Sequence, residues 1–192
     1  MKDQILKDIA EHAAVMENLA GSRDLLAAIE GVTEAILSSL RNGGRLYLFG
    51  CGGSAADAQH IAAEFVNRMH TLRPALPAVA LTTDSSVLTA IGNDDTFDHI
   101  FSRQVEALAR KGDVVIGIST SGSSESVIQG LRAGRSLGAT AVLLTGNRPN
   151  DYQRVADHVI RVPSTSTPRI QEAHITIAHI IATLVEQEYF HG

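Results

Sequence analysis

The stretch that most constrains the fold is a short apolar run that leads into a glycine-rich turn and then into an alanine-rich segment. Residues 45–49 show no helical period, which predicts a buried strand. The glycines of Gly50–Gly53 permit a tight backbone turn, and the alanine-rich residues after Ser54 are strong helix formers. A strand followed by a glycine turn and a helix presents free backbone N–H groups, which is how an α/β protein binds an anion.

The rest of the chain repeats this alternation of apolar runs and helical patterns. Two amphipathic helices are expected first, over residues 3–20 and 24–41. The predicted strands cover residues 45–49, 78–82, 113–118, 140–145 and 158–162. Further helices are expected over residues 85–91 (followed by a turn at Gly92–Asp95), 97–110, 125–137 and 169–189.

Strands that alternate with helices imply a parallel sheet that is covered on both faces, with right-handed crossovers. We therefore expect a flavodoxin-like, three-layer αβα fold with a five-stranded parallel sheet in the order 2-1-3-4-5. In that order the loops after the first and third strands, Gly50–Ser54 and Ser119–Ser124, meet at the topological switch point where ligands bind. The whole chain, residues 1–192, is expected to be a single domain, with N-terminal helices over about 1–42 and an α/β core over about 43–192. Because these two helices precede the sheet, we expect them at subunit interfaces.

Composition excludes several classes of protein. A chain of 192 residues with 44% hydrophobic content can bury one sizeable core. The net charge of −5 and the scattered lysines and arginines give no electrostatic reason to expect nucleic acid. Cys51 is the single cysteine, so an intramolecular disulfide is impossible and a reducing compartment is favoured. The first residues lack an apolar signal core, and no window approaches the roughly 18 apolar residues of a membrane span, so we expect a cytoplasmic protein.

The second loop, Ser119–Ser124, carries five hydroxyl groups around Gly122. Hydroxyl donors together with the N–H groups of a helix start suit a phosphate dianion without a lysine. The alternative is a simple capped turn, although one hydroxyl would be enough for a cap. This loop lacks the Gly-Lys-Ser/Thr ending of a Walker motif, and Gly50–Gly53 lacks the dinucleotide spacing, so nucleotide hydrolysis and hydride transfer are disfavoured.

Two helices carry titratable side chains in patterns that permit chemistry. His60 and Glu64 are four residues apart and share one helical face, either as a catalytic pair or as a surface contact worth a few tenths of a kcal/mol. On the last helix His179 lies among isoleucines, where it is either functional or a structural histidine.

Three further polar residues of the last helix have different expected orientations. Gln171 lies on the same half of the helix as His179, Glu172 is nearly eclipsed with His179, and His174 points elsewhere. For Glu172 and His174 we favour the polar face of a subunit-interface helix.

Taken together, four motifs resemble the sedoheptulose 7-phosphate isomerases, also called phosphoheptose isomerases, of the sugar isomerase (SIS) family. The motifs are GCGGSAADAQH at residues 50–60 with Glu64, GND at 92–94, STSGSS at 119–124 and RIQEAHITIAH at 169–179. The resemblance covers nearly the whole chain. It implies a homotetramer of flavodoxin-like subunits that converts D-sedoheptulose 7-phosphate to D-glycero-D-manno-heptose 7-phosphate through an enediol. This is the first step of ADP/GDP-heptose biosynthesis for lipopolysaccharide and other surface glycans.

The resemblance also implies roles for individual residues. Glu64 matches the catalytic base and His179 its partner acid/base. The phosphate cradle matches Ser119, Thr120, Ser121 and Ser124. Sugar-contacting positions match Cys51, Gly52, Gly53, Ser54, Glu64, Asn93, Asp94 and Gln171. The ligands of one zinc ion per subunit match His60, Glu64, Gln171 and His179. The family usually has an asparagine where this chain has Cys51, so a planar hydrogen-bonding amide is missing from the substrate loop.

A non-enzymatic role is the alternative. The DnaA initiator-associating protein resembles the same family but has lost the catalytic pair, and it acts as a tetrameric binding protein. This chain keeps His60, Glu64, Gln171 and His179, which favours an enzyme. Relatives that act on arabinose 5-phosphate or aminosugar phosphates add other domains or lack the Glu64/His179 pattern.

Overall fold

The computed structural model describes residues 1–149 and 151–191, and its strands form one parallel sheet. The strands are β1 (Leu46–Gly50), β2 (Ala78–Ala80), β3 (Val114–Ser119), β4 (Thr140–Thr145) and β5 (His158–Arg161). The α-helices are α1 (Lys2–Gly21), α2 (Arg23–Arg41), α3 (Gly53–Val66), α4 (Ser85–Asp94), α5 (Ser102–Leu108), α6 (Glu125–Ser136) and α7 (Thr167–Phe190). Two short 3-10 helices, η1 (Phe97–His99) and η2 (Tyr152–Arg154), complete the described elements.

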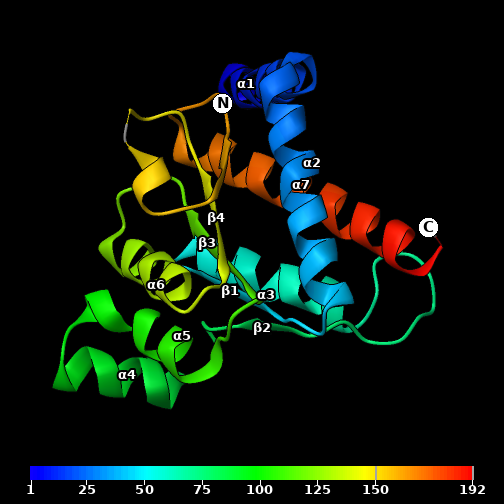
Figure 1. Cartoon of the computed structure of the whole chain (residues 1–192). Helices are drawn as coiled ribbons and strands as arrows, with labels where there is room; N and C mark the ends of the chain where they lie inside the picture. Colours follow the sequence, from blue (N-terminus) through cyan, green and yellow to red (C-terminus); the bar gives the residue numbers. More distant parts are fainter. Residues whose placement is uncertain (150, 192) are drawn as a thin grey trace.

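The strand order is β2-β1-β3-β4-β5 with every pair parallel, which confirms the predicted topology (Figure 1). In the register of the central pair, Leu46 lies opposite Val114 and Gly50 lies opposite Ile118. The ends of β1 and β3 therefore stand next to each other, and so do the loops that follow them.

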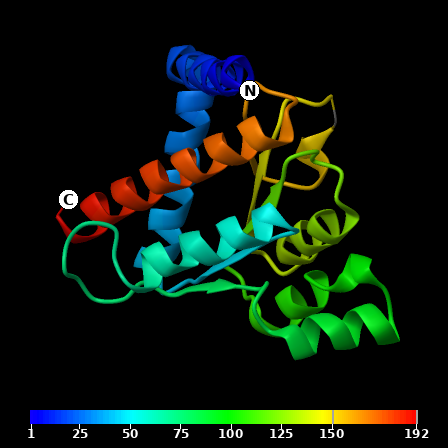
Figure 2. The same cartoon turned by 180° about the vertical axis from the view of Figure 1, so that it is seen from behind.

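Helices cover both faces of the sheet because the central strands are buried on both sides. Leu46 and Leu48 of β1 belong to a core with α2, α3 and α7, whereas Tyr47 and Phe49 belong to a core with α5 and α6. Figure 2 shows α3 and α7 in front of the sheet, and both helices begin near the same edge.

The N-terminal helices differ in how they pack. Helix α2 buries Val32 and Ile36 in the core of its own chain, so one face of α2 packs against the sheet, and its place at a subunit interface stays a prediction. Helix α1 leaves Ile5, Leu6 and Ile9 exposed, at 54%, 56% and 60% of their surface. Apolar surface is thus available on α1. None of the helices among the described residues combines the length and apolar character needed to cross a membrane.

Helix α4 is longer than predicted. Asp84 caps its start by accepting a hydrogen bond from the Val87 N–H at 3.0 Å, and the helix continues through the segment 92–94, where we expected a turn. The turn signal is overridden because the backbone hydrogen bonds continue to Asp95, whose N–H donates to the carbonyl of Ile91 at 3.0 Å. By contrast, the helix expected over 97–110 is divided into η1 and α5.

Candidate active site

The two polar loops predicted to meet line one cavity of about 250 Å³ at the carboxyl edge of the sheet. The cavity lies between the starts of α3, α6 and α7. Its lining residues are Cys51, Ser54, Ile118, Ser119, Thr120, Ser121, Ser124, Thr167 and Gln171. Loops distant in sequence therefore form a single polar hollow at the switch point of the sheet.

Hydrogen bonds within the serine loop hold its turn closed. Gly122 has φ +66°, and its N–H donates to the carbonyl and the Oγ of Ser119 at 3.0 and 3.2 Å. The Oγ of Ser121 accepts from the N–H and the hydroxyl of Ser123 at 3.2 and 3.0 Å. A side chain at Gly122 would also meet Tyr152 and Thr145, so this turn needs glycine for both conformation and space.

The polar groups that line the cavity are uncharged hydrogen-bond donors, mainly hydroxyl groups and backbone N–H groups. None of the described residues that line it carries a charged side chain. Ser124 is the N-cap of α6 and makes no side-chain cap hydrogen bond, so the first N–H groups of α6 are available to an anion, which the helix dipole favours. At the start of α3, the N–H groups of Ser54 and Ala55 instead donate to the carbonyls of Cys51 and Gly52 at 3.2 and 3.0 Å.

The glycine turn brings α3 against α7. Gly52 has φ +61°, and a Cβ on Gly53 would collide with the amide of Gln171. Glycine at position 53 thus allows the start of α3 to approach Gln171 closely.

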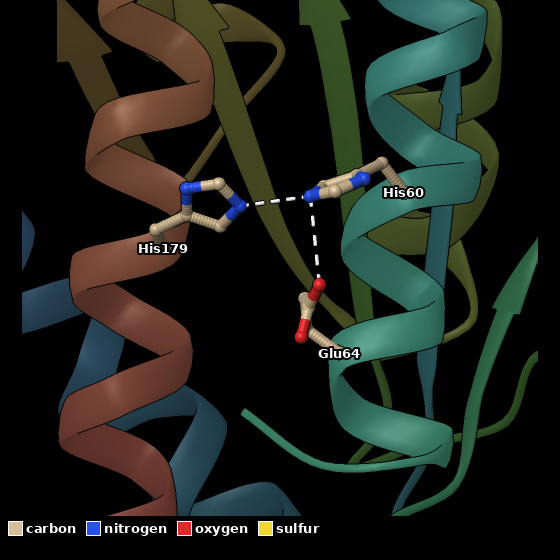
Figure 3. Close-up of side chains that lie close together, drawn as sticks. All are labelled: His60, Glu64 and His179. Atoms are coloured by element: carbon tan, nitrogen blue, oxygen red, sulfur yellow. Dashed lines mark hydrogen bonds and ion pairs between the residues drawn. The ribbon is translucent and has the colours of Figure 1, made fainter. Parts of the chain in front are cut away.

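A second group of polar side chains lies farther along the same two helices. The Nε2 atoms of His60 and His179 are 2.8 Å apart, and Glu64 Oε1 lies 3.5 Å from His60 Nε2 (Figure 3). The two imidazole rings meet edge to face, with centroids 5.0 Å apart. His179 is therefore neither isolated nor enclosed by isoleucines, because its ring reaches across to α3.

These two sites are connected by one face of each helix. On α3, Gly53, His60 and Glu64 follow a helical stripe, and on α7 Gln171 and His179 do the same. From Gly53 to His60, or from Gln171 to His179, the rise along the helix is about 10–12 Å. The cavity and the His/Glu group thus lie about 10–12 Å apart along the same pair of helices, an arrangement that we call the elongated site.

Asp57 occupies the middle of this α3 stripe and was not identified from the sequence. Its Oδ2 atom is buried without a hydrogen-bond partner among the described residues. Burial raises the pKa of Asp57, and the neighbouring His60 opposes this by lowering it. The spacing of Gly53, Asp57, His60 and Glu64 was a signal that could have identified it.

Of the two polar residues of α7 that we expected on an interface face, His174 lies inside the subunit, and an interface role for Glu172 stays a prediction. His174 is buried inside the subunit with 1% exposure, and burial lowers its pKa to about 4. Glu172 lies 2.8 Å from Nδ1 of His12 on α1 and also bonds Arg169, and these two partners lower its pKa although burial alone would raise it.

The remaining predicted residues lie at different distances from the cavity. Cys51 lies beside the serine loop, with its Sγ 3.5 Å from Ser126 Oγ and 3.9 Å from Ser124 Oγ. Gly52 and Cys51 also line an adjoining, mostly apolar cavity of about 170 Å³. Asn93 and Asp94 bond each other at the end of α4, and they are not among the residues that line either cavity.

The donor chemistry of the His/Glu group fits a metal ion. One ligand atom from each of His60, Glu64 and His179 lies within 4.8 Å of the others. Two imidazoles and a carboxylate are usual zinc ligands, and tetrahedral zinc with bonds of about 2.0–2.1 Å separates two nitrogens by about 3.4 Å. A small rotation of the two rings from 2.8 Å would satisfy that geometry. Gln171 is near Gly53 and the cavity, so its place as a fourth ligand stays a prediction.

Comparison with known proteins identifies relatives over almost the full chain. Residues 9–146 match the SIS domain family. A phosphoheptose isomerase of Burkholderia pseudomallei (strain 1710b) is 50% identical over 186 residues, which cover 97% of this chain and 94% of the relative.

Solved structures agree with the sequence comparison. A phosphoheptose isomerase from Neisseria gonorrhoeae superimposes with a TM-score of 0.90 at 40% identity, covering 97% of this chain and 98% of that one. One from Francisella tularensis gives a TM-score of 0.92 at 34% identity, covering 96% and 97%. The similarity therefore extends through all seven helices and the sheet described above.

Proposed function

The chain belongs to the SIS family and, within it, to the phosphoheptose isomerases, and from this premise we propose how its residues divide the reaction. The reaction is the aldose–ketose isomerisation of D-sedoheptulose 7-phosphate to D-glycero-D-manno-heptose 7-phosphate. The observation that carries the proposal is the elongated site, with neutral anion donors at one end and a His/Glu group at the other.

Dimensions support this substrate. An extended chain of seven carbons with a terminal phosphate spans on the order of 10 Å, taking single bonds of ordinary length. This matches the helical rise of about 10–12 Å between the ends of the site. With the 7-phosphate at Ser119, Thr120, Ser121 and Ser124, carbons 1 and 2 lie beside the His/Glu group.

The isomerisation needs two proton movements, one on carbon and one on oxygen. Glu64 takes a proton from C1 while the oxygen on C2 gains one, which gives the enediol. Glu64 then returns its proton to C2 while the hydroxyl on C1 loses its own, so the carbonyl moves from C2 to C1. His179 transfers the proton between the two oxygens, and its contact with His60 orients its ring.

We further propose zinc as the metal, with His60, Glu64 and His179 as ligands and Gln171 as the fourth. Glu64 and His179 would each bind it through one atom, which leaves the second carboxylate oxygen and the second ring nitrogen for the proton transfers. A bound zinc ion would supply polarisation of the sugar carbonyl. Cys51, Gly52, Gly53 and Ser54 are proposed to contact the sugar from the glycine turn.

A homotetramer completes the proposal. The exposed apolar face of α1 supports contacts between subunits, because isolated soluble chains rarely leave such clusters uncovered. Asn93 and Asp94 stand apart from the cavity of their own subunit, so the sugar contacts proposed for them need α4 to move or a second subunit to contribute them.

The test is direct assay of the purified protein with sedoheptulose 7-phosphate, with the aldose product followed by NMR. We expect the wild type to form the heptose and Glu64→Gln to form it at least 100-fold more slowly, the usual scale for one acid/base group. A wild type that binds inorganic phosphate but forms no aldose would contradict the proposal and favour a binding protein instead.

A further inference from the structure

A buried ion pair joins the C-terminal ends of α3 and α7, beyond the residues that the reaction uses. Arg73 Nε donates to Glu186 Oε2 at 2.7 Å, and both side chains are only 3% exposed. Arg73 belongs to the loop that follows α3, whereas Glu186 lies on α7, seven residues after His179. Residues seven apart share a helical face, so Glu186 points to the same side of α7 as His179.

The guanidinium of Arg73 also holds the end of α3. Its Nη2 donates to the carbonyl of Glu64 at 2.8 Å, and its Nη1 donates to the carbonyl of Phe65 at 2.9 Å. These carbonyls belong to the last turn of α3, where a helix lacks internal donors and where a cation is favoured by the helix dipole. The backbone of the proposed base is thus bonded directly to Arg73.

Glu186 is fixed just as firmly. Its carboxylate accepts from the N–H groups of Met69, His70 and Thr71 at 2.8, 2.9 and 2.9 Å. Burial raises the pKa of Glu186, but these hydrogen bonds and Arg73 overcome that effect and hold the pKa well below its usual range. Glu186 is therefore an ionised anchor that wraps the loop after α3 around α7.

Three contacts then connect α3 with α7 along the site. Gly53 meets Gln171 at the N-terminal ends, His60 meets His179 in the middle, and Arg73 joins the last turn of α3 to Glu186 at the C-terminal ends.

We propose that Arg73 and Glu186 are positioning residues that set the separation between the His60/Glu64 side chains and His179. The pair touches neither the cavity nor the side chains of the His/Glu group, so it acts through the helix ends. It controls the metal-binding and proton-transfer end of the site and leaves the phosphate end unaffected, because that end is fixed by Gly53 and Gln171. The inference rests on the proposed function for its catalytic consequence, but its consequence for metal binding is independent of that function.

The test uses Arg73→Lys and Glu186→Gln in the full chain. Lysine keeps the charge but cannot bond two carbonyls and a carboxylate in one plane, and glutamine keeps the shape but loses the charge. We expect each change to lower kcat at least tenfold with KM changed less than threefold. Zinc affinity, measured by competition with a chromophoric chelator, should fall 10- to 100-fold, the usual effect of residues that orient metal ligands. Affinity for inorganic phosphate should stay within twofold of the wild type.

Asp113→Asn is the matched control. Asp113 is 5% exposed and accepts from the N–H groups of Arg45 and Arg110 at 2.9 and 2.7 Å, at the opposite edge of the sheet. The Asp113→Asn variant should have a lowered Tm, as the two test variants should. Its kcat, measured at a temperature below that Tm, and its zinc affinity should stay at wild-type values.

Several results would overturn the inference. The inference fails if Arg73→Lys and Glu186→Gln keep the kcat and zinc affinity that the Asp113→Asn control shows. It also fails if their affinity for inorganic phosphate falls as much as their affinity for zinc. A wild type that binds no zinc would also overturn it, whatever its activity. A wild type that binds zinc but forms no aldose would instead refute the proposed function, and the zinc affinities would still decide the inference.

Discussion

Acidification should destabilise this protein through His174. The residue is 1% exposed, and neither ring nitrogen has a hydrogen-bond partner of ordinary geometry among the described residues. Burial lowers the pKa of His174 from 6.5 to about 4, although the nearby backbone of Thr145 favours the charged form and offsets part of that effect. The folded protein therefore keeps the ring neutral at pH values where the unfolded chain protonates it.

The sign and size follow from proton linkage. Between pH 6.5 and about 4 the unfolded state binds more protons, so the free energy of unfolding falls as the pH falls through this window. The difference between the two pKa values corresponds to about 3 kcal/mol in full, and to about 2 kcal/mol between pH 7 and pH 5. At pH 7 the group contributes almost none of this loss.

The perturbation is His174→Leu, which removes the titrating ring and keeps an apolar side chain of similar size. At pH 7 we expect its stability to equal or exceed that of the wild type, because two buried nitrogens without partners are removed. From pH 7 to pH 5 the wild type should lose about 2 kcal/mol more than the variant. Urea unfolding at a fixed protomer concentration measures this, since assembly makes stability depend on concentration. Equal losses in the two proteins would refute the reasoning, and so would an NMR titration of His174 with a midpoint near 6.5.

The remaining predictions concern the site itself. Glu64→Gln should reduce turnover by about 10²–10⁴-fold with folding retained, as measured by NMR assay and circular dichroism, and wild-type turnover would remove this residue from the mechanism. Ser121→Ala should weaken inorganic phosphate binding by about 1.5–3 kcal/mol in calorimetry, and an unchanged affinity would place the phosphate elsewhere. Gly53→Ala should raise KM because its methyl group displaces the amide of Gln171, and combining it with Gln171→Ala should not raise KM further than Gln171→Ala alone. Chelation should abolish activity and zinc should restore it, whereas an active chelated enzyme would exclude a metal role for His60.

Local sequence signals were enough to predict the order of elements and the family. The apolar runs at the strands lack helical period, and each is followed by a helical pattern, which leaves few topologies other than a parallel sheet. The serine loop and the glycine turn were predicted to meet because both follow central strands, and they line one cavity. Local signals were weaker where they competed with neighbouring contacts, as at Gly92, which lies inside α4 rather than in a turn.

The resemblance grouped His60, Glu64 and His179 as one site, but only the tertiary structure showed which of these side chains touch and which other residues lie beside them. His60 and His179 are 119 residues apart, and their 2.8 Å contact depends on the packing of α3 against α7. The same packing makes His174 an internal residue rather than part of an interface, because the face of a helix that is buried depends on its neighbours in space. Arg73 and Glu186 carry no motif at all, since a buried ion pair is recognisable only when both partners and their shared hydrogen bonds are seen together. Hydrophobic periodicity and turn chemistry depend on residues that are neighbours in the sequence. The distance between two helices depends instead on contacts along their entire length, between residues that are far apart in the sequence.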